Sequence, residues 1–211
     1  MELPWNDEYQ GEIFRQSCED TKNHLKFSNG ESINSKDLGA LMWRMWIMSY
    51  ATKHAIEFAR GNNFNFVECG VADGFSAFIA LREIVGNKKT VNCFSMHLYD
   101  SWGAMKKEHL FENESGIAGF RSNNNIETAK KNLGEFKDNT VYHKGYIPDT
   151  LDNSDAPTNI IYLHIDLNSE KSTSETLDFF YPKIVSGGVI LFDDYGLKEF
   201  ESTRKLVDKF F

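Results

Sequence analysis

Short apolar runs alternate along this chain with longer segments in which apolar residues recur every three or four positions. The short runs predict five buried β-strands, at residues 65–70, 91–99, 140–143, 160–166 and 188–192. The longer segments predict helices between them. Strands that alternate with helices in this way indicate an α/β fold with a doubly wound parallel sheet.

The helical segments carry recognisable start and stop signals. One begins at Ser35, a predicted N-cap, and a Ser172-x-x-Glu175 capping box predicts another that runs to Pro182. Further helices are predicted at residues 75–86, 126–134 and around 198–210. Residues 103–120 are polar and predict a loop or mobile cover. We expect residues 1–34 to form an arm or cover and residues 35–211 to form one domain.

Acidic residues follow the last two predicted strands. Asp166 ends one, and Asp193 and Asp194 end the other, so three carboxylates are expected at one edge of the sheet, where ligands of α/β proteins bind. Such a cluster favours a hard cation such as Mg²⁺, or a proton, between the carboxylates. The alternative is that each carboxylate is only a helix cap or turn residue.

Glycines follow the first predicted strand, in the order Glu68-Cys69-Gly70-Val71-Ala72-Asp73-Gly74. Glycine at such a turn lets a ligand approach the backbone and the N-terminus of the next helix. A tight turn without a ligand is the alternative. The pattern differs from the dinucleotide-binding G-x-G-x-x-G, because Glu68 replaces the first glycine. Asp100 ends the second strand, where Rossmann-like folds bind ribose hydroxyls; a solvated loop residue is the other interpretation.

Composition narrows the class of partner. The chain has 23 Lys and Arg against 31 Asp and Glu, a net charge of -8, which argues against nucleic acid and anionic membranes and favours a small molecule. The three widely spaced cysteines and the acidic N-terminus without a signal peptide predict a reduced, cytoplasmic location. No segment approaches the roughly 20 apolar residues of a membrane span.

Other chemistry-bearing residues have simpler interpretations. The six histidines lack zinc-binding spacing, and His164, inside an apolar strand, is expected to be a core residue. The Met- and Trp-rich segment 42–48 has helical spacing and predicts core packing. Ser101 has no nucleophile elbow around it, which argues against a hydrolase.

Taken together, these residues resemble a class I S-adenosylmethionine-dependent methyltransferase, and more narrowly the macrocin O-methyltransferase family of metal-dependent sugar methylases. The resemblance extends from about Phe66 to Phe210. Its most specific part is Ile165-Asp166-Leu167-Asn168, then Tyr181-Pro182-Lys183, Gly187-Gly188 and Asp193-Asp194-Tyr195-Gly196. Supporting motifs are Glu68-Cys69-Gly70-Val71, Asp100-Ser101-Trp102-Gly103 and Lys144-Gly145-Tyr146.

The resemblance implies the cofactors S-adenosylmethionine and Mg²⁺, and a hydroxyl of a sugar or other small molecule as methyl acceptor. It implies that the cofactor is bound by Glu68, Gly70, Gly74, Asp100, Ser101, Gly145 and Tyr146. The metal ligands would be Asp166, Asp193 and Asp194. A catechol-type methylase and a non-catalytic S-adenosylmethionine-binding domain are the alternatives.

Two departures from the family pattern affect these expectations. The family usually has a second Asp two residues after Asp166, the natural base, whereas this chain has Asn168. That leaves His143, His97 or a metal-bound hydroxide as the base, and Asp166, Asn168 and His143 as the candidate catalytic residues. The chain also ends at Phe211, where this fold normally adds a two-stranded hairpin. We therefore expect strand order 3-2-1-4-5 and an edge at 188–192. This edge is expected to be covered by the N-terminal arm or by a second copy, which would give a homodimer or higher oligomer. The alternative is that the chain is a truncated version of a longer protein.

Overall fold

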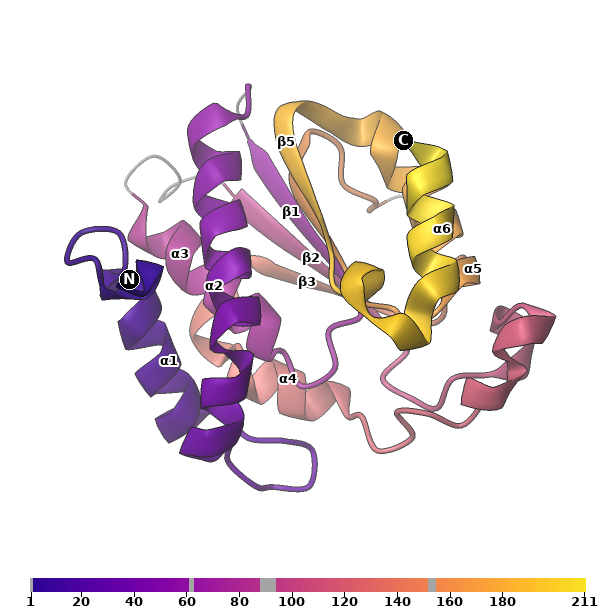
Figure 1. The fold of residues 1–211 in the computed structure, drawn as a ribbon, viewed down its shortest axis with the longest axis horizontal. Coiled ribbons are helices and arrows are strands. Elements are labelled where there is room, and N and C mark those ends of the chain that lie inside the picture. Colours follow the sequence, from indigo (N-terminus) through magenta and orange to yellow (C-terminus); the bar gives the residue numbers. More distant parts are fainter. Residues whose placement is uncertain (1, 61–62, 88–93, 152–154) are drawn as a thin grey trace.

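The computed structural model describes residues 2–60, 63–87, 94–151 and 155–211. Its centre is a five-stranded parallel sheet, and Figure 1 shows helices on both of the sheet's faces. The strands are β1 (Phe64–Cys69), β2 (Phe94–Asp100), β3 (Thr140–Lys144), β4 (Ile160–Ile165) and β5 (Ile184–Phe192). Their order is β3-β2-β1-β4-β5, which confirms the predicted Rossmann-like topology with β5 at an edge.

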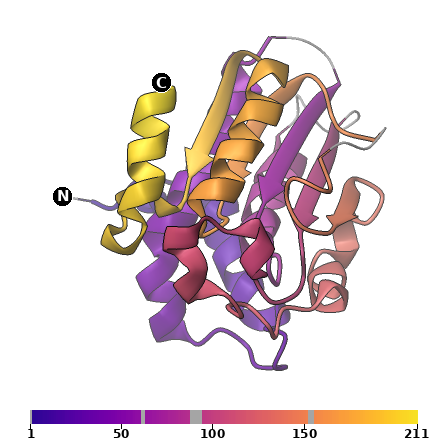
Figure 2. The same cartoon turned by 90° about the vertical axis from the view of Figure 1, so that its right-hand side faces the viewer.

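The helices form two layers. One face of the sheet is covered by α2 (Ser35–Phe58), α3 (Phe75–Gly86) and α4 (Ile126–Asn132), and α1 (Glu12–His24) packs outside against α3. The other face is covered by α5 (Glu170–Phe180) and α6 (Glu201–Phe210), as Figure 2 shows from the side. Phe66 of β1 points into the first layer and Val67 into the second. Burial on both faces explains why the central strands consist largely of apolar residues.

The structure corrects two predicted helix starts. Asn34, not Ser35, caps α2, because its extended backbone lets the side chain accept hydrogen bonds from the N–H groups of Lys36 and Asp37. Similarly, Ser169 caps α5 and accepts from the N–H of Ser172. The predicted capping box at Ser172 is therefore wrong, since Ser172 already lies in the first turn.

Other boundaries also differ. β5 begins at Ile184, before the predicted residue 188, and the last helix begins at Glu201 after a 3₁₀ turn over Lys198–Phe200. Residues 91–93 of the predicted second strand lie outside the described residues. The segment 103–120 contains two 3₁₀ helices, Lys107–His109 and Glu112–Ile117. Among the described residues, no helix is both long and apolar enough to cross a membrane.

Candidate functional site

The candidate site lies where the parallel strands end. Backbone bonds continue the sheet one residue beyond the strands: Gly70 N donates to Tyr99 O (2.8 Å), Asp166 N to Cys69 O (2.8 Å) and Asp193 N to Ile165 O (3.0 Å). Gly70, Asp166 and Asp193 are therefore held side by side. The residues that follow the strands, rather than those inside them, supply the chemistry.

A cavity opens at this edge, and we call it the sheet-edge cavity. It is lined by five of the predicted cofactor residues: Gly70, Asp100, Ser101, Gly145 and Tyr146. Asp166 and Asn168 line it as well. The predicted cofactor and catalytic residues are thus largely brought together.

Gly70 has to be glycine. Its φ of +91° is unfavourable for other residues, and a Cβ there would lie 1.8 Å from the carbonyl oxygen of Asp166. The close contact joins the loop after β1 to the end of β4. Gly145 also has a positive φ, of +152°, and its N–H donates to the Asp100 carbonyl (2.9 Å).

The Asp100 carboxylate organises the loops around the cavity. Oδ2 accepts from the N–H groups of Val71 and Ala72 (both 2.8 Å), and Oδ1 accepts from that of Trp102 (2.6 Å). Burial raises the pKa of this carboxyl, and the three N–H groups partly oppose that shift. Asp100 therefore ties the loop after β1 to the loop after β2.

Tyr146 is the aromatic wall of the cavity. Its ring stacks on His109 with centroids 4.5 Å apart, and Lys106 Nζ lies 4.6 Å from its centroid. Its hydroxyl donates to Ala104 O (2.9 Å). His109 and Lys106 belong to the segment 103–120, so the predicted cover does line the cavity.

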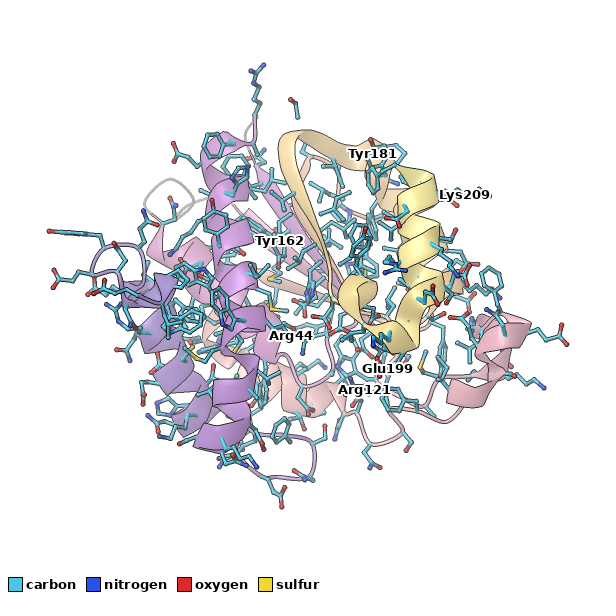
Figure 3. All side chains as sticks on the ribbon, viewed as in Figure 1. Arg44, Arg121, Tyr162, Tyr181, Glu199 and Lys209 are labelled. Atoms are coloured by element: carbon cyan, nitrogen blue, oxygen red, sulfur yellow. The ribbon has the colours of Figure 1, made fainter. Side chains whose placement is uncertain are left out.

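Two of the three predicted metal-binding carboxylates converge on one cation, the guanidinium of Arg44 from α2. Arg44 Nη2 contacts Asp166 Oδ2 at 2.5 Å, and Arg44 Nε contacts Asp193 Oδ1 at 2.5 Å. Figure 3 shows Arg44 at the lower, carboxyl end of the sheet. Burial, and then the charge of Asp193, raise the pKa of Asp166 to about 6, while Arg44 lowers it.

The Asp194 carboxylate, the third predicted metal ligand, does not contact Arg44 in the described structure but binds Asn168. It is buried and accepts two bonds from Asn168, one from the backbone N–H to Oδ2 and one from Nδ2 to Oδ1, both 2.8 Å. Asn168 has a φ of +53°, which Asn tolerates better than most residues. The structure therefore joins Asp194 to Asn168 rather than to Asp166 and Asp193.

A buried imidazole completes the group around the carboxylates. One ring nitrogen of His164 and one oxygen each of Asp166 and Asp193 lie within 4.8 Å of one another. His164 is fully buried, and neither of its ring nitrogens has a hydrogen-bond partner among the described residues. Two converging carboxylates beside such an imidazole fit a divalent cation. His164 was expected to be only a core residue.

Three predicted site residues lie away from the cavity. Glu68 is fully buried, accepts a bond from Ser76 Oγ (2.5 Å) and lies 3.7 Å from His164 Nδ1. Gly74 begins α3 with a φ of +84° and packs against Leu133. His143 lies within β3, buried against His97 and stacked on Tyr99 at 4.0 Å. None of the three lines the sheet-edge cavity.

A second cavity adjoins the first, and we call it the helix-side cavity. The two share Gly70, Ala72, Arg121 and Asp166. Arg44 lines the helix-side cavity with apolar side chains of α2. Sequence reasoning missed both arginines. The signal for Arg44 was a single charge within the Met- and Trp-rich segment, of which Met45, Trp46 and Met48 are buried while Trp43 and Ile47 are exposed.

Solved structures share this fold. The O-methyltransferase NovP is 18% identical, with a TM-score of 0.73, over 96% of this chain and 88% of its own. The calicheamicin methyltransferase CalS11 is 13% identical, with a TM-score of 0.63, over 96% of this chain and 85% of its own. Comparison with curated protein sequences gives no significant match. A family model described as a methyltransferase domain matches residues 67–195, more than half of the sequence. The chain therefore belongs to the methyltransferase-domain family and is a class I S-adenosylmethionine-dependent methyltransferase.

Proposed function

We propose that this protein transfers a methyl group from S-adenosylmethionine to a hydroxyl of a sugar or another small molecule, with help from a divalent cation. The observation that carries the proposal is the sheet-edge cavity. Five residues that the resemblance assigns to the cofactor line it together with Asp166 and Asn168. The fold shared with two methyltransferases, one of them named an O-methyltransferase, supports it.

The protein mainly has to align the methyl donor with the acceptor. S-adenosylmethionine supplies a methyl group that is already activated by a positively charged sulfur. Gly70 lets the loop after β1 approach the end of β4, and Asp100 and Tyr146 line the cavity from the carboxyl ends of β2 and β3. Holding both reactants in this way replaces an encounter in solution by a nearly intramolecular step.

Asp166 is the proton acceptor that we favour. Of the carboxylates that line the two cavities, it is the one common to both. Bound S-adenosylmethionine would give up its methyl group to the acceptor oxygen as the carbon–sulfur bond breaks with its electron pair left on sulfur, and the hydroxyl proton would pass to the Asp166 oxygen that does not hold the cation. Asn168 cannot accept that proton. A cation at Asp166 and Asp193 would lower the pKa of the acceptor hydroxyl.

Two measurements test the proposal. Calorimetry should show binding of S-adenosylhomocysteine, and the Asp100→Ala change should weaken it by about 1–3 kcal/mol because the loops lose their common anchor. Transfer of labelled methyl should then be assayed on sugars and catechols, with Mg²⁺ and with a chelator. Transfer to sugars supports the proposal, and transfer to catechols alone identifies the catechol-type alternative. Binding without transfer to any acceptor would indicate a non-catalytic domain.

A further inference from the structure

We propose that Arg44 is a built-in cation for the Asp166–Asp193 pair, and that a divalent cation binds there only after Arg44 withdraws. This inference rests on the metal-assisted part of the proposed function. One guanidinium meets two carboxylates from the ends of neighbouring strands, each at 2.5 Å. It therefore occupies the position between these oxygens that a bound cation would take.

The Asp166 and Asp193 carboxylates are stabilised by a positive charge between them. Their side chains are only 12% and 15% exposed, and both lie within reach of one guanidinium, so two like charges are close together and poorly hydrated. A guanidinium with fork-shaped donors neutralises both at once. Arg44 thus stabilises the close approach of the two carboxylates.

Arg44 can also leave. Its side chain is 39% exposed, much more than either carboxylate, and it lines the helix-side cavity. Movement of this one side chain frees Asp166 Oδ2 and Asp193 Oδ1 while the backbone bonds keep Asp166 and Asp193 in place. His164 remains on the buried side. The site without Arg44 therefore offers two carboxylates and one imidazole, a set suited to Mn²⁺ as well as to Mg²⁺.

The two cations exclude each other. They need the same carboxylate oxygens, and they repel electrostatically. The apparent metal affinity is then reduced by the fraction of molecules in which Arg44 is withdrawn. If Arg44 holds the carboxylates in about nine-tenths of the molecules, removing it should lower the apparent Kd for the metal about tenfold.

The experiment is a titration of the full chain with Mn²⁺, in which free Mn²⁺ is followed by electron paramagnetic resonance. The variants are Arg44→Met, Arg44→Gln and Asp193→Asn, and circular dichroism checks that each is folded. The matched control is Arg121→Met, since Arg121 lines the same helix-side cavity. We expect tighter binding by about tenfold in both Arg44 variants, a Kd within about twofold of wild type in Arg121→Met, and loss of binding in Asp193→Asn.

Equal or weaker Mn²⁺ binding in both Arg44 variants would overturn the inference, and so would tighter binding that persists in Arg44→Met/Asp193→Asn. Two Arg44 variants are used so that a folding failure in one leaves the test intact. S-adenosylhomocysteine binding, measured on the same samples, separates this result from the proposed function. If the wild-type protein does not bind S-adenosylhomocysteine, the proposed methyl transfer is contradicted. The comparison of Mn²⁺ affinity between wild type and the Arg44 variants would still decide the role of Arg44.

Discussion

Asn168 departs from the pattern of the family that the sequence resembles, and the structure gives it a definite contact. The Asn168→Asp change would replace the Nδ2 donor to Asp194 by a second carboxylate beside a buried one. We expect the free energy of unfolding at neutral pH to fall by about 1–3 kcal/mol. The backbone should adapt, because Asp also tolerates a positive φ. Urea unfolding measures the change.

The control for this prediction is the exchanged pair. In Asn168→Asp/Asp194→Asn, the donor and the acceptor trade places, so most of the lost stability should return. An Asn168→Asp protein as stable as wild type would show that the contact with Asp194 contributes little, and a double variant no better than the single one would lead to the same conclusion.

His97 should make the fold sensitive to acid. It is buried beside His143 (2.9 Å), and burial, followed by the charge of His143, lowers its pKa from 6.5 to about 4. The unfolded chain therefore binds more protons between these values, and the stability present above pH 6.5 is lost as the pH falls towards 4. His97→Gln should reduce the loss between about pH 7 and 4.5 by about 1–2 kcal/mol. Unfolding curves at both pH values measure it.

Exposed His24 provides the comparison, since His24→Gln should keep the full acid sensitivity of the wild type. If the His97→Gln protein loses as much stability in acid as wild type, other groups dominate the pH dependence.

Single residues also show how far sequence reasoning reaches. Asp100 and Asp166 could be predicted because a carboxylate directly after a strand has to face the ligand edge. His143 could not be placed in this way, since it lies inside β3 opposite Tyr99, and only the next position, Lys144, is level with Asp100. Arg44 could not be recognised as a site residue, because its partners Asp166 and Asp193 are more than 120 residues away in the sequence. Nothing in the sequence of its own helix indicates these partners.

At the scale of elements, we expect the turn between β1 and α3 to affect cofactor binding. In Gly70→Ala, a Cβ would collide with the Asp166 carbonyl and the loop would have to move. We expect the affinity for S-adenosylhomocysteine to fall at least about tenfold, since small displacements of binding groups are costly. Calorimetry measures the loss.

Gly39→Ala is the matched control for Gly70→Ala. Gly39 lies in α2, and a Cβ added there would have nothing within 4 Å. Its replacement should leave cofactor affinity unchanged and stabilise the helix by about 0.5–1 kcal/mol. Undiminished affinity in Gly70→Ala would mean that the loop can shift without harm to the cavity.

Two side chains attach the segment 103–120 to α5: Glu114, and Lys171, whose Nζ donates to the Glu108 carbonyl (2.9 Å). The Glu114 carboxylate accepts bonds from the N–H of Glu170 (2.5 Å) and from Ser169 Oγ (3.2 Å), at the N-terminus of the helix, where a negative charge is favourable. Glu114→Gln should weaken this attachment by about 1 kcal/mol, so hydrogen exchange in 103–120 should become about fivefold faster. The exposed neighbour Glu112, changed to Gln, should have no such effect; equal rates in both variants would contradict the attachment.

The elements themselves were predicted well where burial imposes a pattern. Both faces of the central strands are covered, so β1 and β4 are mostly apolar and could be recognised, although they also bury Glu68 and His164. Helix starts were less predictable, because Asn34 and Ser35, like Ser169 and Ser172, are all suitable caps by residue type. Only the backbone conformation decides which of them accepts the free N–H groups. For the polar first 34 residues the sequence indicated only an irregular or partly helical arm, and the bounds of α1 could not be predicted.

For the whole molecule, we still expect self-association. β5 is an edge strand, and beside it lies a groove lined by Tyr181, Ile184, Ile190, Phe192 and Phe211. Exposed apolar edges favour pairing with a second copy. Light scattering should therefore show a mass above the monomer that falls on dilution, and Ile190→Lys should shift the equilibrium towards monomer. A monomer at all concentrations would contradict this prediction.

The Asp100 carboxylate, which holds three backbone N–H groups from two loops, also affects turnover. Loops that are fixed before a ligand binds lose little conformational entropy on binding. The heat-capacity change of cofactor binding should therefore reflect only the apolar area that the cofactor buries. Product and fresh cofactor can then exchange without refolding of the cavity wall. The rate of that exchange should depend on how often the segment 103–120 opens, because its residues Met105, Lys106 and His109 line the cavity.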